Sequence, residues 1–112
     1  MRYAVLKVNY VEDMGDPGHI WGIDAHLLGV YRTLEGAYEG VDKWYDKEIA
    51  FLKKSYLADD IQSVLYTYDT IKERCDNPNH ADRIRVSQIE YGFTDQSIEV
   101  IFIQKIDETK LM

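Results

Sequence analysis

The residue types best suited to chemistry gather in one short stretch, residues 12–22, which reads EDMGDPGHIWG. Its carboxylates and its histidine are metal ligands, and its glycines allow the backbone to turn tightly. The stretch fails the EF-hand template, because Gly15 and Pro17 stand where that loop needs side-chain oxygen atoms. We therefore predict no calcium site in this stretch.

A transition-metal site is the alternative for the same region, and it would need His19, carboxylates such as Asp13 or Asp16, and a further ligand such as His26. The two histidines follow no standard ligand spacing, so only the fold could bring them together. The Gly-Asp-Pro-Gly core of the stretch is typical of a tight turn. We interpret the stretch as a loop between two strands, and we predict no metal and no cofactor. Its candidate partner contacts are Asp16, His19 and Trp21.

A more specific pattern follows in residues 34–55, where carboxylates recur at spacings of four, three and four. The four residues are Glu35, Glu39, Asp42 and Asp46, which we name the acidic ladder. On a helix they would stay within a band of roughly 60° and span about 16 Å. Neighbouring carboxylates about 5–6 Å apart imitate the repeated charges of a nucleic-acid backbone and would suit a basic groove. A solvated helix face gives the same pattern, and the sequence leaves both interpretations open.

Catalytic motifs are missing from the sequence. It contains no Gly-x-Gly-x-x-Gly, no phosphate-loop lysine motif and no Gly-x-Ser-x-Gly elbow. Cys75 and His80 could pair as nucleophile and base, yet Cys75 continues the apolar face of an expected helix. We interpret Cys75 as a buried, inert thiol and predict that the protein is not an enzyme.

The composition limits the kinds of partner. The 112 residues carry a net charge of −7 with a pI near 4.8, which opposes direct binding to nucleic acid. Nine tyrosines and two tryptophans supply the large amphipathic area that recognition surfaces use. No apolar run is long enough to span a membrane, and the first residues lack the apolar core of a signal peptide. We therefore expect one cytoplasmic domain, residues 1–112, whose partner is a protein with a basic surface.

Hydrophobic periodicity predicts an α+β domain with the order ββααββ. The expected strands cover residues 2–11, 21–32, 83–92 and 97–106. The expected helices cover residues 34–55, capped by Thr33, and a segment that starts after Asp59 or Asp60 and stops before Pro78. The apolar face of that second helix would comprise Ile61, Val64, Leu65, Tyr68, Ile71 and Cys75. This order predicts a four-stranded, mainly antiparallel sheet with both helices packed on one face.

The last expected strand has apolar residues on both of its faces. Ile98, Val100 and Phe102 point one way, while Ile101 and Ile103 point the other. Such a strand lies in the interior of a sheet, or its outer face meets something else.

Residues 27–44, LLGVYRTLEGAYEGVDKW, resemble an element of small proteins encoded by bacteriophages and other mobile elements. In that element, a strand ending in Gly-Val-Tyr or Gly-Val-Phe precedes a Ser or Thr and then an acidic helix start with alanine. Some small acidic proteins of this kind inhibit host defence systems, including CRISPR nucleases. The resemblance implies a phage-type inhibitor or accessory protein in the host cytoplasm, and it implies no catalytic residue.

Three functions follow as hypotheses. The first, which we favour, is a non-enzymatic inhibitor of a nucleic-acid-handling or defence enzyme that binds through the acidic ladder by phosphate-backbone mimicry. The second is a protein that binds or sequesters a nucleotide-like ligand. Its stacking residues would be Trp21, Tyr31 and Trp44, and its phosphate contacts would be Arg83 and Arg85. The third is a metal-dependent enzyme that uses His19, His26 and Asp24.

Overall fold

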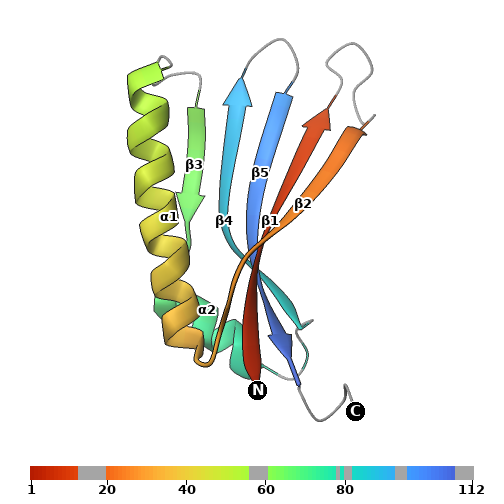
Figure 1. Ribbon diagram of the computed structural model, residues 1–112, viewed down its shortest axis with the longest axis vertical. Coiled ribbons are helices and arrows are strands. Elements are labelled where there is room, and N and C mark those ends of the chain that lie inside the picture. The colour runs from red at the N-terminus through yellow and green to blue at the C-terminus, as the bar shows by residue number, and fades with distance from the viewer. Residues whose placement is uncertain (13–19, 56–60, 78, 80–81, 93–95, 108–112) are drawn as a thin grey trace.

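The computed structural model describes residues 1–12, 20–55, 61–77, 79, 82–92 and 96–107. The strands are β1 (Arg2–Glu12), β2 (Ile20–Tyr31), β3 (Ile61–Leu65), β4 (Arg83–Gly92) and β5 (Gln96–Ile106) (Figure 1). The helices are α1 (Leu34–Ser55) and α2 (Tyr68–Asp76). The α+β class predicted from the sequence is confirmed. Within these ranges, no helix has the length and apolar character needed to cross a membrane.

All five strands form one sheet in the order β2-β1-β5-β4-β3, and every neighbouring pair is antiparallel. β1 and β5 pair along their whole length, from Arg2 opposite Ile106 to Glu12 opposite Gln96. This pairing joins the two hairpins β1–β2 and β4–β5 into a single sheet. The predicted number of four strands is wrong, because β3 adds a fifth strand at one edge.

β3 replaces the first half of the predicted second helix, so the order is ββαβαββ and not ββααββ. The segment IQSVL pairs with β4, with Leu65 opposite Ser87. Its β-branched residues Ile61 and Val64 lose side-chain freedom in a helix and suit an edge strand. Leu65 packs against the core while Val64 is 41% exposed, so these two residues alternate as strand residues do.

Helix α2 is capped by Thr67, so it begins later than the predicted helix, which starts after Asp59 or Asp60. Thr67 has an extended backbone, and its Oγ1 accepts a hydrogen bond from the Thr70 amide at 3.3 Å. Ile71 and Cys75 lie on the buried side of this helix. The buried position of Cys75 agrees with the thiol predicted from the sequence, and burial raises its pKa.

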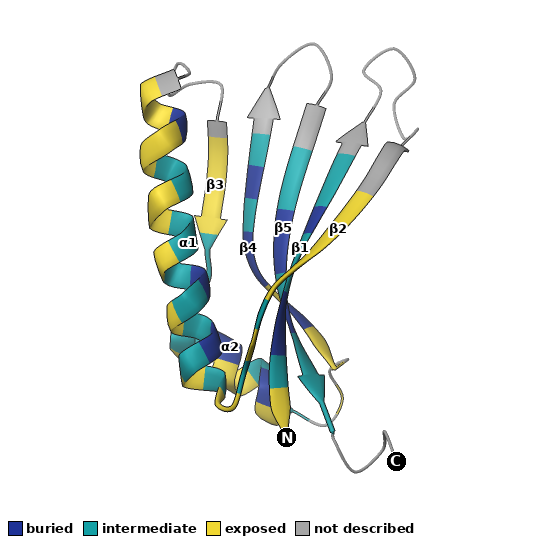
Figure 2. Ribbon diagram, viewed as in Figure 1, coloured by how far each residue is buried: buried dark blue, intermediate teal, exposed yellow. Residues whose placement is uncertain are grey.

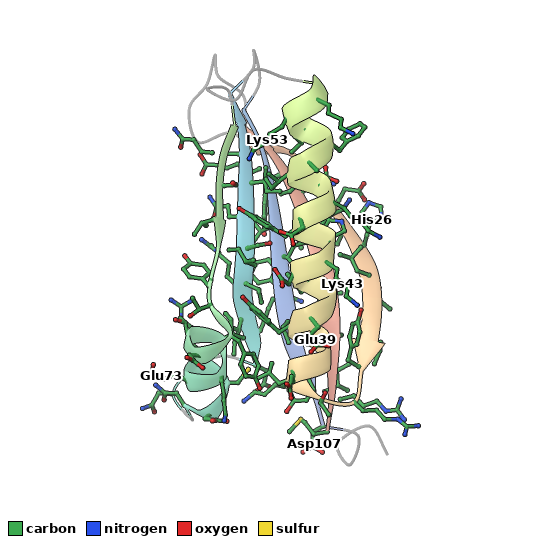
Figure 3. All side chains as sticks on the ribbon, turned by 90° about the vertical axis from the view of Figure 1, so that its left-hand side faces the viewer. His26, Glu39, Lys43, Lys53, Glu73 and Asp107 are labelled. Atoms are coloured by element: carbon green, nitrogen blue, oxygen red, sulfur yellow. The ribbon has the colours of Figure 1, made fainter. Side chains whose placement is uncertain are left out.

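Both helices cover the same side of the sheet, which we name the helix face; the opposite side is the open face. Figure 3, turned by 90° from Figure 1, shows α1 in front of the strands with α2 beside its first turns. The smaller core cluster lies under the second half of α1 and contains Leu52 and Ile89. Figure 2 shows that burial concentrates on β1, β4 and β5, while β2 and β3 are largely exposed. The main core cluster comprises Val5, Ala37, Val41, Ile71, Cys75, Ile84, Val86, Ile101 and Ile103.

Thr67→Ala is expected to lower the free energy of unfolding by about 1 kcal/mol, because the Thr70 amide loses its capping acceptor. Urea denaturation followed by circular dichroism measures this change. Thr67→Ser keeps the hydroxyl oxygen and is expected to retain most of the stability. Equal losses in the two variants would contradict a capping role for the Thr67 side chain.

Candidate functional site

The acidic ladder lies on α1, whose start is fixed by a cap. The Gly36 amide donates to Thr33 Oγ1 at 3.0 Å, and the Ala37 amide donates to the Thr33 carbonyl at 3.1 Å. Ala37 and Val41 are fully buried against the sheet, and Leu52 is 3% exposed. These buried residues fix the rotation of the helix about its axis, so the ladder faces roughly a third of a turn away from them.

The ladder is open to solvent along most of its length. Glu35, Glu39 and Asp46 are exposed, and Asp42 is partly buried. Among the residues that the structure describes, no hydrogen bond or ion pair joins these four carboxylates to a partner. Figure 3 shows Glu39 on the side of α1 that faces away from the sheet. The four carboxylates therefore share one side of the helix, as their spacing predicts.

Tyr38 borders the ladder on α1 and contacts two further tyrosines, Tyr66 and Tyr68. The Tyr38 hydroxyl donates to the Tyr66 carbonyl at 2.6 Å, and the ring centroids of Tyr38 and Tyr68 lie 5.5 Å apart. The pKa of Tyr38 is raised by burial first and by the Asp42 carboxylate, one helical turn further along α1, second. The Arg74 guanidinium lies 4.8 Å from the centre of the Tyr66 ring. Sequence reasoning missed these tyrosines, because their contacts depend on where β3 ends and α2 begins.

Lysines border the ladder on its other side. Lys43 and Lys47 are exposed and lie about 90° around the helix from the carboxylates. Figure 3 shows Lys43 one turn beyond Glu39 on the outer side of α1. Within the ranges that the structure describes, neither lysine forms an ion pair with a carboxylate of the ladder. The negative strip is narrow, with tyrosines along one border and lysines along the other.

The described part of the structure does not place the other candidate contacts beside the ladder. Asp16 and His19 lie outside those residues, and so does the side chain of Trp21. The backbone of Trp21 belongs to β2, which forms one edge of the sheet. The ladder lies toward β3, which forms the opposite edge. The structure therefore does not bring the backbone of Trp21 next to the ladder.

Of the three residues of the metal-dependent enzyme hypothesis, the two that the structure describes, His26 and Asp24, form a pair. His26 Nε2 and Asp24 Oδ2 lie 2.9 Å apart on β2, with side chains 50% and 71% exposed. His19, the remaining ligand of that hypothesis, lies outside the described residues. Across the described part of the chain, no three histidine, cysteine or acidic side chains gather in a way that could hold a metal ion.

Four residues of the nucleotide hypothesis have described side chains, and they lie on opposite faces of the sheet. Tyr31 and Trp44 pack against the main core on the helix face. Arg83 lies 5.6 Å from the centre of the Phe102 ring on the open face, and Arg85 stands opposite Phe102 in the sheet. The sheet therefore separates the proposed stacking residues Tyr31 and Trp44 from the proposed phosphate contacts.

A charged cluster lies between α1 and the sheet. Lys7 Nζ on β1 and Glu99 Oε1 on β5 lie 3.6 Å apart, and their side chains are 22% and 13% exposed. The pKa of Glu48 on α1 is raised by burial first and by the Glu99 carboxylate second, while Lys7 opposes the shift. The cluster thus holds two carboxylates beside one ammonium group, under the helix that carries the ladder.

Comparison of the chain with models of protein families, with curated proteins and with solved structures found no match. The resemblance of residues 27–44 to phage-encoded proteins therefore stays a prediction. The function has to be inferred from the ladder and from the elements that position it.

Glu48→Gln is expected to raise the free energy of unfolding at pH 7. The raised pKa means that the folded protein holds the Glu48 proton more tightly than the unfolded chain does. Charged Glu48 therefore costs stability at neutral pH, and this cost disappears as the pH falls through the raised pKa toward the ordinary value of 4.5. The advantage of the variant over the wild type should shrink over the same range.

Thermal unfolding at neutral and at acidic pH measures this difference. Glu73→Gln, which removes an exposed carboxylate from α2, is the matched control and should change stability little at either pH. A Glu48→Gln variant that is less stable than the wild type at pH 7 would show that attraction to Lys7 outweighs burial, against our expectation.

Proposed function

We propose that the protein is a non-enzymatic binding protein whose acidic ladder docks on a basic surface of a protein partner. The observation that carries this proposal is the line of four carboxylates on one side of α1, none of which has a hydrogen-bond or ion-pair partner among the described residues. Charges without an internal partner stay available to an incoming cationic surface. Surface charges arranged in this way also speed and orient association.

Electrostatics favours a ladder over a single charge. One exposed ion pair contributes about 0.2–1 kcal/mol, so an isolated carboxylate would hold a partner only weakly. Carboxylates three and four residues apart repel one another in the free protein. A basic groove along the helix, about 16 Å long, would relieve this repulsion at all four positions together.

The tyrosines beside the ladder support a specific contact. Tyr38 is held by its hydrogen bond to the Tyr66 carbonyl and by its contact with the Tyr68 ring. Such rings bring a large contact area, and side chains already held in place lose little entropy on binding. Charges would then guide the approach of the partner, and the aromatic border would add affinity.

In its specific form, the proposal is an inhibitor of a host nucleic-acid-handling enzyme, such as a defence nuclease. Carboxylates about 5–6 Å apart offer repeated negative charge to a surface that otherwise binds phosphates. The resemblance of residues 27–44 to small acidic phage proteins, some of them anti-CRISPR inhibitors, supports this form. The protein would act in the host cytoplasm, with Asp16, His19 and Trp21 as secondary contacts.

Reversing two charges of the ladder, with Glu39→Lys and Asp42→Lys together, is expected to abolish capture of the partner. Immobilised wild-type protein would retain the partner from a bacterial lysate, and mass spectrometry would identify and quantify it. We expect at least about a tenfold loss of the retained protein, because two attractive contacts become repulsive and each tenfold corresponds to about 1.4 kcal/mol.

Glu73→Lys with Asp76→Lys is the matched control, since it changes the net charge by the same amount at exposed positions of α2. Circular dichroism would verify that both double variants fold. Loss of capture in the ladder variant alone would support the proposal. Equal capture by all three proteins, or equal loss in both double variants, would contradict it, since the ladder would then matter no more than any other surface charge.

A further inference from the structure

The open face of the sheet is apolar at its centre, although no helix in the described residues lies on it. Val8 on β1 and Val100 on β5 are only 5% and 3% exposed. Leu27 on β2 is 62% exposed, and Val30 on the same strand is 47% exposed. A sheet face that meets only water normally carries polar residues, and a contiguous apolar patch marks a binding surface.

The strand register divides this face into three rows that run across the strands from β2 or β1 to β4. The arginine row contains Leu27, Leu6, Phe102 and Arg85. The middle row contains Ala25, Val8, Val100 and Gln88. The glutamate row contains Tyr10, Ile98 and Glu90. Residues within a row stand opposite one another on neighbouring strands, so each row is a band of adjacent side chains.

A two-fold rotation makes the open face complementary to the open face of a second copy. A two-fold axis along the middle row, between two facing copies, places the arginine row of one copy over the glutamate row of the other. Arg85 then meets Glu90 of the partner subunit. By the same operation, Phe102 meets Ile98 of the partner subunit, and Leu6 meets Tyr10 of the partner subunit. The middle row has small side chains on β2, β1 and β5, which lets the two sheets approach.

The size of the face fits a stable interface. Strands of about 11 residues at 3.3 Å each are about 36 Å long, and the four long strands together are about 19 Å wide. The resulting area of roughly 700 Å² is close to the 800 Å² or so that each partner buries in a standard interface. Two such sheets stack about 10 Å apart with their strands within about 30° of each other.

The charges of the open face also permit contact between two acidic chains. Its described charged side chains are Arg2, Arg83, Arg85 and Glu90, so the described part of this face does not carry the negative excess of the chain. The acidic ladder lies on the helix side of the molecule and stays away from this surface. Two open faces can therefore meet without bringing the main negative charges together.

We propose that two copies of the chain associate through their open faces into a dimer of stacked sheets, with the helices on the outside. The Arg85–Glu90 contact occurs twice in this dimer and sets its register. The proposal goes beyond the function of the ladder and does not depend on it, since the ladder remains exposed in each copy.

Analytical ultracentrifugation of the full chain tests this proposal. At about 100 μM, well above the micromolar dissociation constants at the weak end for an interface of this size, we expect the mass of a dimer. Arg85→Glu makes residue 85 of each copy face Glu90 of the other, so two carboxylates meet at two places in the dimer. We expect the dissociation constant to rise at least tenfold, about 1.4 kcal/mol. Leu27→Glu introduces a charge among the apolar residues of the arginine row and should also raise the dissociation constant. Combining Arg85→Glu with Glu90→Arg exchanges the pair and is expected to restore the dimer.

Lys43→Glu, on the outer side of α1, is the matched control and should leave the dimer unchanged. Circular dichroism would verify the fold of each variant, and recovery in the exchanged double variant would separate a lost interface from a lost fold. A wild-type monomer at this concentration would overturn the proposal. A dimer that tolerates both Arg85→Glu and Leu27→Glu would also overturn it, because the contact would then lie elsewhere.

Discussion

Burial of one sheet face under α1 and α2 is the constraint on which the rest of the structure depends. Ala37 and Val41 must face the sheet, and this requirement fixes which side of α1 meets water. The ladder is exposed because its spacing keeps it off the buried side, and not because any contact holds it there. The hydrogen bond from Tyr38 to the Tyr66 carbonyl then fixes α1 relative to the junction of β3 and α2. A line of like charges is tolerated on a helix whose position is set by its apolar residues.

Periodicity in the sequence predicts the long elements well, since each of β1, β2, α1, β4 and β5 repeats its pattern over ten or more residues. β3 escapes prediction because five residues offer too few positions for alternation, and because Ile61, Val64, Leu65 and Tyr68 also fit helical spacing. Its strand conformation comes from pairing with β4, which is a tertiary contact. The strand order depends likewise on the pairing of β1 with β5, which lie at opposite ends of the sequence.

The candidate site likewise has one part that the sequence predicts and one part that only the fold reveals. The acidic ladder is visible in the sequence because helical geometry alone aligns residues three and four apart. The tyrosine border is not visible, because Tyr38 and Tyr66 stand 28 residues apart and meet only after β3 and α2 have formed. The two sides of the molecule differ in chemistry as a result. The helix side presents carboxylates and tyrosines, and the open face presents apolar side chains edged by Arg83 and Arg85.

The central claim is that the ladder occupies a surface of its partner that otherwise binds nucleic acid, and competition tests this claim most directly. The partner captured from lysate would be mixed with fluorescently labelled protein and titrated with DNA, and binding would be followed by fluorescence anisotropy. We expect DNA to displace the labelled protein, and we expect the affinity of the protein for its partner to fall steeply as salt is added. Binding that saturating DNA leaves unchanged would contradict the claim.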